Sequence, residues 1–198
     1  MKKIYKCFIL TFFYSLTLVA QNEESLIIRK AESQLLETLS KIPIGSEKKY
    51  GFDLREDFQK CKVGKPIKVL TLEKINSEYA TVETNEWRIP ITLNSNNVLL
   101  MTARKINDDY EIVDLGGQYL AKELQEIKIS KNENQYLLRL YNLHIDFIAT
   151  TIRPIEKDTQ FLPLNSAKIF LKEYQNKGLE KQYTLNYIIE LNQLNSKL

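Results

Sequence analysis

Three residues could together perform nucleophilic chemistry. Cys61 is the one cysteine after residue 20, and His144 is the one histidine of the chain. Asp146 follows His144 by two residues, a spacing that places both side chains on the same face of a β-strand. In such a group the carboxylate orients the imidazole, which takes the proton from the thiol. Cys61, His144 and Asp146 are therefore the weak candidate catalytic residues.

Other interpretations of these residues stay open. The residues around Cys61 (QKCKVG) match no thiol-protease signature, so a buried inert thiol and a disulfide to a second chain are alternatives. A structural zinc site needs several histidines and cysteines, which the chain lacks once residues 1–20 are set aside. Gly116-Gly117 lacks the further glycines or Lys-Ser/Thr of phosphate-binding loops and is typical of a tight turn. We therefore expect no metal and no cofactor.

Residues 1–20 are typical of a secretory signal peptide. Basic residues come first, and Cys7 to Ala20 then form an uncharged apolar run that is too short for an ordinary membrane-spanning helix. We expect removal of this segment and export of the remainder to a periplasmic or extracellular location. The mature chain then has no transmembrane span.

Removal of this segment also changes the charge of the protein. The chain has 28 Lys and Arg against 25 Asp and Glu, and Lys2, Lys3 and Lys6 lie in the leader, which leaves the mature chain balanced. A balanced chain lacks the positive field on which nucleic-acid binding depends. We therefore expect no nucleic-acid partner.

The elements that would position the candidate residues follow from periodicity. Apolar residues three and four apart predict an amphipathic helix over 23–41, followed by a loop over 44–64 with a short helical turn near 54–60. Five short strands joined by polar turns then predict an antiparallel meander. These strands are 66–74, 78–84, 87–94, 98–106 and 110–115.

The remainder of the chain predicts further helices around a second β segment. Residues 118–127 form a helix, and 135–150 form either one bent strand or two strands broken near Asn142. Two helices end the chain, at about 165–174 and 180–196.

The expected fold is α+β: an antiparallel β-meander sheet packed by an N-terminal helix and C-terminal helices. Residues 21–198 would form a single α+β domain with a sub-boundary near 128–134. A helix on such a meander is the general layout of cystatin-like and NTF2-like domains, by analogy of architecture only, because no motif indicates either family.

These patterns favour one function over two alternatives. Because no catalytic signature is present, the leading hypothesis is an exported non-enzymatic binding or protein-interaction module whose partner is another exported protein or a small ligand. One alternative is a secreted hydrolase with an unrecognised carboxylate or Cys–His site. The other is an accessory or inhibitory domain of a secreted partner.

Overall fold

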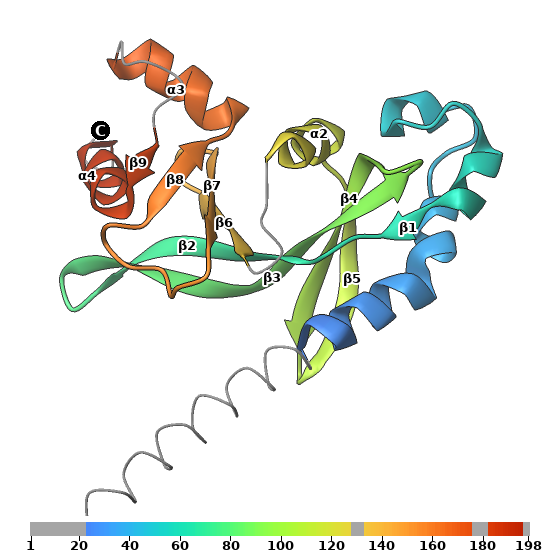
Figure 1. Ribbon diagram of the computed structural model, residues 1–198, viewed down its shortest axis with the longest axis horizontal. Helices are drawn as coiled ribbons and strands as arrows, with labels where there is room; N and C mark the ends of the chain where they lie inside the picture. The colour runs from blue at the N-terminus through green and yellow to red at the C-terminus, as the bar shows by residue number, and fades with distance from the viewer. Residues whose placement is uncertain (1–22, 128–132, 176–181, 196–198) are drawn as a thin grey trace, which may run out of the picture.

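An open, mostly antiparallel sheet forms the centre of the molecule, with helices at its N- and C-terminal sides (Figure 1). The computed structural model describes residues 23–127, 133–175 and 182–195. The arrangement confirms the predicted α+β fold. The predicted signal peptide and most of the predicted sub-boundary at 128–134 lie outside the described residues.

The N-terminal helix (residues 23–40) forms where the apolar spacing predicts it. Ile27, Ala31, Leu35 and Leu39 are buried on one face, whereas Leu36 is half exposed. Two short 3-10 helices follow, η1 (Glu47–Tyr50) and η2 (Arg55–Lys60). η2 confirms the helical turn predicted near 54–60, whereas η1 was not predicted.

Residues 66–116 form four strands of the sheet, one fewer than the five predicted there. The predicted strands 78–84 and 87–94 are a single strand, β3, which continues through Asn85 and Glu86 with a shift of its register against β2. Thr84 bridges this region, since its hydroxyl donates to the Val69 carbonyl and accepts the N–H of Glu86. The strands are β1 (Lys62–Val63), β2 (Ile67–Ile75), β3 (Glu78–Leu93), β4 (Asn96–Ile106) and β5 (Asp109–Gly116).

The second half follows α2 and resolves the open question about residues 135–150, which form two strands. Its elements are α2 (Gln118–Glu126), β6 (Asn134–Leu140), β7 (Ile145–Thr151), β8 (Gln160–Pro163), α3 (Asn165–Gln175), β9 (Tyr183–Thr184) and α4 (Leu185–Asn195). Three strands, β1, β8 and β9, were not predicted from the sequence, and they are only two to four residues long.

The strand order is β5-β4-β3-β2-β6-β7-β8-β9, and β1 pairs with β3. β2 and β6 pair in parallel, whereas the other strand pairs are antiparallel, so the sheet is mostly antiparallel as predicted. Parallel neighbours need a long connection between them, and here the chain passes through β3, β4, β5 and α2. This single pairing joins the two halves into one continuous sheet.

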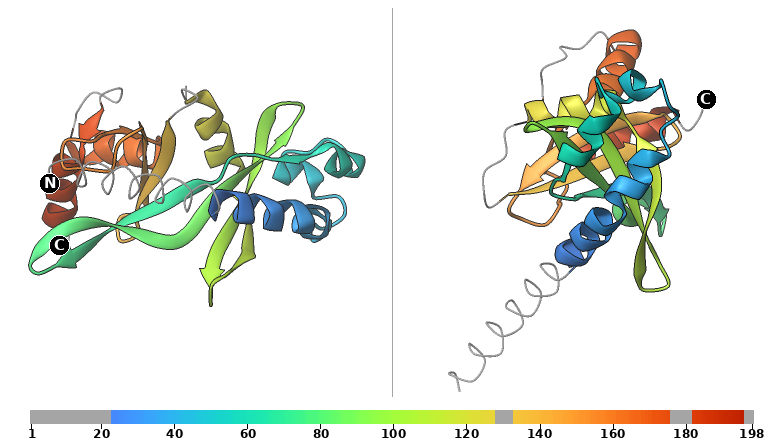
Figure 2. Two further views of the ribbon diagram at one scale, coloured as in Figure 1. Left: turned by 60° about the horizontal axis from the view of Figure 1, so that its bottom comes forward. Right: turned by 90° about the vertical axis from the view of Figure 1, so that its right-hand side faces the viewer.

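Side chains of β2 that point to opposite faces of the sheet belong to different apolar clusters of the core. Ile67 and Val69 join α2 in one apolar cluster, while Leu70 joins the cluster formed with α3 and α4. A third cluster lies between the N-terminal helix and strands β3 to β5 and includes Trp87. Figure 2 shows that the helices at the two ends of the twisted sheet are well separated.

Candidate functional site

Cys61 is a half-buried thiol at the end of η2. Its Sγ donates to the carbonyl of Asp57 at 3.4 Å, and it packs against the core under the N-terminal helix. Burial, and next the negative charge of Asp57, raise its pKa to about 11. The thiol is therefore protonated at neutral pH, opposite to what a nucleophilic cysteine requires.

His144 and Asp146 do not share a strand face, contrary to the sequence prediction. His144 is exposed in the turn between β6 and β7 with a left-handed φ of 55°, and β7 begins only at Ile145. Asp146 is buried, and its two carboxylate oxygens accept from Nε and Nη2 of Arg139 at 2.8 and 2.9 Å. The Asp146 carboxylate is thus held by a guanidinium instead of orienting an imidazole.

The structure does not bring the three candidate catalytic residues together. Cys61 directly precedes β1, whereas Asp146 lies on β7, and these strands lie on opposite sides of α2 (Figure 1). Over the described ranges, no hydrogen bond or ion pair connects Cys61 with either other residue. Within the same ranges, no three His, Cys, Asp or Glu side chains are grouped so that they could hold a metal ion.

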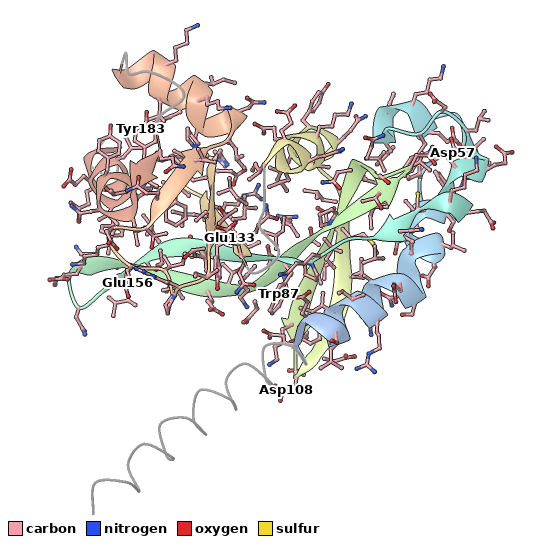
Figure 3. The ribbon with its side chains drawn as sticks, in the orientation of Figure 1. Asp57, Trp87, Asp108, Glu133, Glu156 and Tyr183 are labelled. Atoms are coloured by element: carbon pink, nitrogen blue, oxygen red, sulfur yellow. The ribbon has the colours of Figure 1, made fainter. Side chains whose placement is uncertain are left out.

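A hollow lies along the β2–β3 hairpin, and we call it the strand groove. It consists of three adjoining cavities of about 500, 470 and 170 Å³. The first two share Thr81 and Ile155, and the last two share Glu83, Asn134 and Tyr136. Figure 3 labels Glu156 and Trp87, which line the two opposite ends of the groove.

One end of the strand groove is mainly apolar. Three separate parts of the chain form it: the tip of the β2–β3 hairpin, the loop between β7 and β8, and α4. At this end Lys157 Nζ lies 3.9 Å from a carboxylate oxygen of Glu78, an ion pair that joins the loop to the hairpin. Both partners are largely exposed, so this ion pair is weak. The apolar lining residues are Ile75, Tyr79, Ala80, Ile155, Leu185 and Ile189.

The opposite end is polar and carries charges of both signs, since its lining includes Lys65 and Lys68 together with Glu23, Glu24 and Glu83. Lys68 Nζ lies 3.6 Å from the centre of the Trp87 ring and 3.4 Å from a carboxylate oxygen of Glu83. Burial lowers the pKa of Lys68, and the charge of Glu83 opposes that effect. Gln135 also lines this end, and its buried Nε2 has no hydrogen-bond partner among the residues that the structure describes.

The chemistry of the strand groove suits binding. An apolar end joined to a polar end matches an amphiphilic ligand, and pockets of this size and character commonly bind small molecules or chain segments. None of the sequence-predicted candidate residues lines any of its three cavities. The groove was not predicted from the sequence because its walls come from segments that are far apart in the chain. The periodicity within each segment predicts its secondary structure but not which other segments it contacts.

No described helix is both long enough and apolar enough to cross a membrane. In comparisons with known proteins, no family model, no curated protein and no solved structure matches the chain.

Proposed function

We propose that the protein is an exported, non-enzymatic binding module that holds an amphiphilic ligand in the strand groove. One observation carries the proposal: three cavities that share lining residues lie next to one another along the β2–β3 hairpin, apolar at one end and charged at the other. The placement of Cys61, His144 and Asp146 gives no support to the alternative of a thiol hydrolase. The export part of the proposal depends on residues 1–20.

The binding part is tested by blocking the groove at its centre. Thr81 lines both larger cavities, so Thr81→Phe places a ring where they meet. Val82→Phe is the matched control, because the neighbouring side chain on the strand points to the opposite sheet face. The probe is 1-anilinonaphthalene-8-sulfonate, which combines apolar rings with an anionic group and is followed by fluorescence titration.

We expect saturable dye binding by the wild-type protein and a loss of affinity of about tenfold or more in Thr81→Phe, since the added ring removes contact volume. Val82→Phe should stay within about twofold of wild type. Urea unfolding of all three proteins establishes that both variants are folded. Equal dye affinity in the three proteins would show that the groove is not the binding site.

The export part is tested separately by expressing the full chain and sequencing the N-terminus of the protein recovered from the exported fraction. We expect it to begin at or near Gln21. A chain that still begins at Met1 and stays in the cytosolic fraction would contradict export without affecting the binding test.

A further inference from the structure

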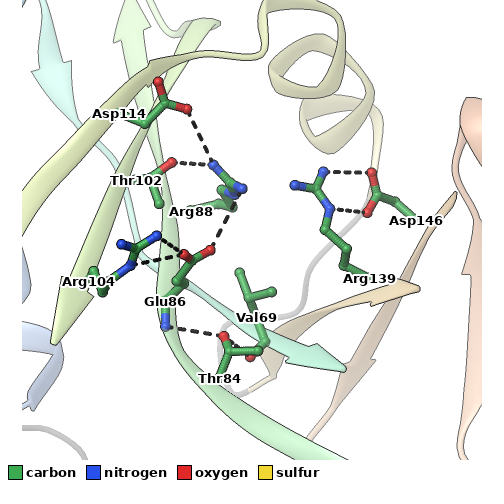
Figure 4. A network of polar contacts seen from close by, with 9 residues as sticks. All are labelled: Val69, Thr84, Glu86, Arg88, Thr102, Arg104, Asp114, Arg139 and Asp146. Atoms are coloured by element: carbon green, nitrogen blue, oxygen red, sulfur yellow. Dashed lines mark hydrogen bonds and ion pairs between the residues drawn. The ribbon is translucent and has the colours of Figure 1, made fainter. Parts of the chain in front are cut away.

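Two arginines face each other on the sheet face opposite the Lys68–Trp87 contact. Arg88 comes from β3 and Arg139 from β6, and Figure 4 shows their guanidinium groups pointing toward one another. Their side chains are 14% and 26% exposed, so both charges are largely withdrawn from water. The pKa of Arg88 lies below its ordinary value, first because of burial and second because of the positive charge of Arg139.

Each carboxylate near Arg88 either accepts hydrogen bonds from another arginine or lies beyond hydrogen-bond distance of Arg88. Asp146 is held by Arg139, and Glu86 Oε1 accepts from Nε and Nη2 of Arg104 at 3.1 and 2.6 Å. Arg88 therefore reaches Glu86 only at 3.9 Å and the exposed Asp114 only at 4.0 Å. These separations exceed those of a hydrogen bond.

Arg88 consequently keeps unused hydrogen-bonding capacity. Its Nη1 donates to the Thr102 hydroxyl, whereas its buried Nε has no partner within the described part of the chain. Arg139 uses Nε and Nη2 for Asp146, which leaves Nη1 outside that pair. A buried N–H without a partner is costly, and two guanidinium groups that face each other repel.

We propose that Arg88 and Arg139 bind one oxyanion, a phosphate or a carboxylate group, between their guanidinium groups. Such an anion accepts from the free N–H groups of both arginines and separates their like charges. The site lies on another sheet face from the strand groove and does not depend on the proposed function.

The surrounding charges set the expected affinity. Arg88, Arg104 and Arg139 are matched by Glu86, Asp114 and Asp146, so the cluster has no net positive charge. Binding therefore relies on two or three directed hydrogen bonds instead of a strong field. This predicts a dissociation constant on the order of 1 mM for a simple anion.

The test follows the arginine Nε–H signals by NMR while the ¹⁵N-labelled protein is titrated. Sodium phosphate and sodium acetate are added in separate experiments, with sodium chloride keeping the ionic strength constant. We expect the signal that disappears in Arg88→Gln to shift saturably with at least one anion. The two arms distinguish a phosphate site from a carboxylate site, and the absence of a saturable shift in both would overturn the proposal.

Two variants and a control test the location of binding. Arg88→Gln should weaken binding, measured calorimetrically, by about tenfold or more, because a charge-assisted donor is lost. Thr102→Asp supplies a permanent carboxylate beside Arg88 Nη1 and should remove anion binding even if Arg88→Gln fails to fold. Arg29→Gln alters an exposed arginine of the N-terminal helix and should leave binding unchanged. Undiminished binding by folded Thr102→Asp would refute the site.

Discussion

The state of the Cys61 thiol is the most direct test of the argument against thiol catalysis. Its pKa rises from 9.0 to about 11, mainly because of burial. Each pH unit below the pKa lowers the thiolate fraction about tenfold, so at pH 8 Cys61 holds about 100-fold less thiolate than an ordinary cysteine. Partial burial also restricts access of the reagent. We therefore expect alkylation in the folded protein to be at least about 100-fold slower than in the unfolded chain.

The assay measures iodoacetamide incorporation by mass spectrometry, in native buffer and in urea, from pH 7 to 10. The native rate should still be rising at pH 10, whereas the unfolded chain should approach a plateau above pH 9. This difference in pH profile separates a raised pKa from simple steric protection, which would slow the native reaction at every pH without displacing its pH profile. A native rate at pH 8 equal to or above the unfolded rate would refute the reasoning and restore Cys61 as a candidate nucleophile.

Two further predictions concern stability, both measured by urea unfolding. Asp146→Asn should lower the free energy of unfolding by about 2 to 4 kcal/mol, because it breaks the largely buried ion pair in which Asp146 accepts two hydrogen bonds from Arg139. The control Asp114→Asn should change the free energy of unfolding by less than about 0.5 kcal/mol. Equal effects of the two substitutions would contradict the pairing of Asp146 with Arg139. Gly117→Ala should cost about 1 to 2 kcal/mol, because Gly117 has a φ of 71° and an added Cβ would lie 3.3 Å from Leu100 Cδ1. At Gly116 no atom lies within 4 Å of an added Cβ, so Gly116→Ala should lower the free energy of unfolding clearly less than Gly117→Ala. A larger loss in Gly116→Ala than in Gly117→Ala would contradict the left-handed conformation of Gly117.

The sequence predicted those elements that are specified locally. Apolar spacing identified the N-terminal helix and α2, and Asn-Ser and Asn-Asp pairs marked the turns before β3 and β5. Those turns indeed contain residues with positive φ, including Asn76 and Asn107. Local chemistry was sufficient in these places because helix periodicity and turn conformation depend on neighbouring residues.

The elements that were missed depend on distant partners. The parallel contact between β2 and β6 and the short strands β8 and β9 exist through pairing with segments that are remote in sequence. The strand groove and the Arg88–Arg139 site likewise form between segments that are remote in sequence. Alternation along 87–94 puts Arg88 and Trp87 on opposite faces of the strand, but nothing local indicated that Arg139 would face Arg88.

The length of β3 also has a consequence for mispairing during folding. The strand runs for 16 residues, contributing Tyr79 to the packing near the C-terminal helices and Trp87, Ile89 and Ile91 to the core beneath the N-terminal helix. A slip of β3 by one residue would turn all of these side chains to the wrong side at once, and would drive Arg88 into an apolar layer. A slip at one end of β3 would therefore also misplace side chains at its other end, and this one strand constrains the register of its three partners, β1, β2 and β4.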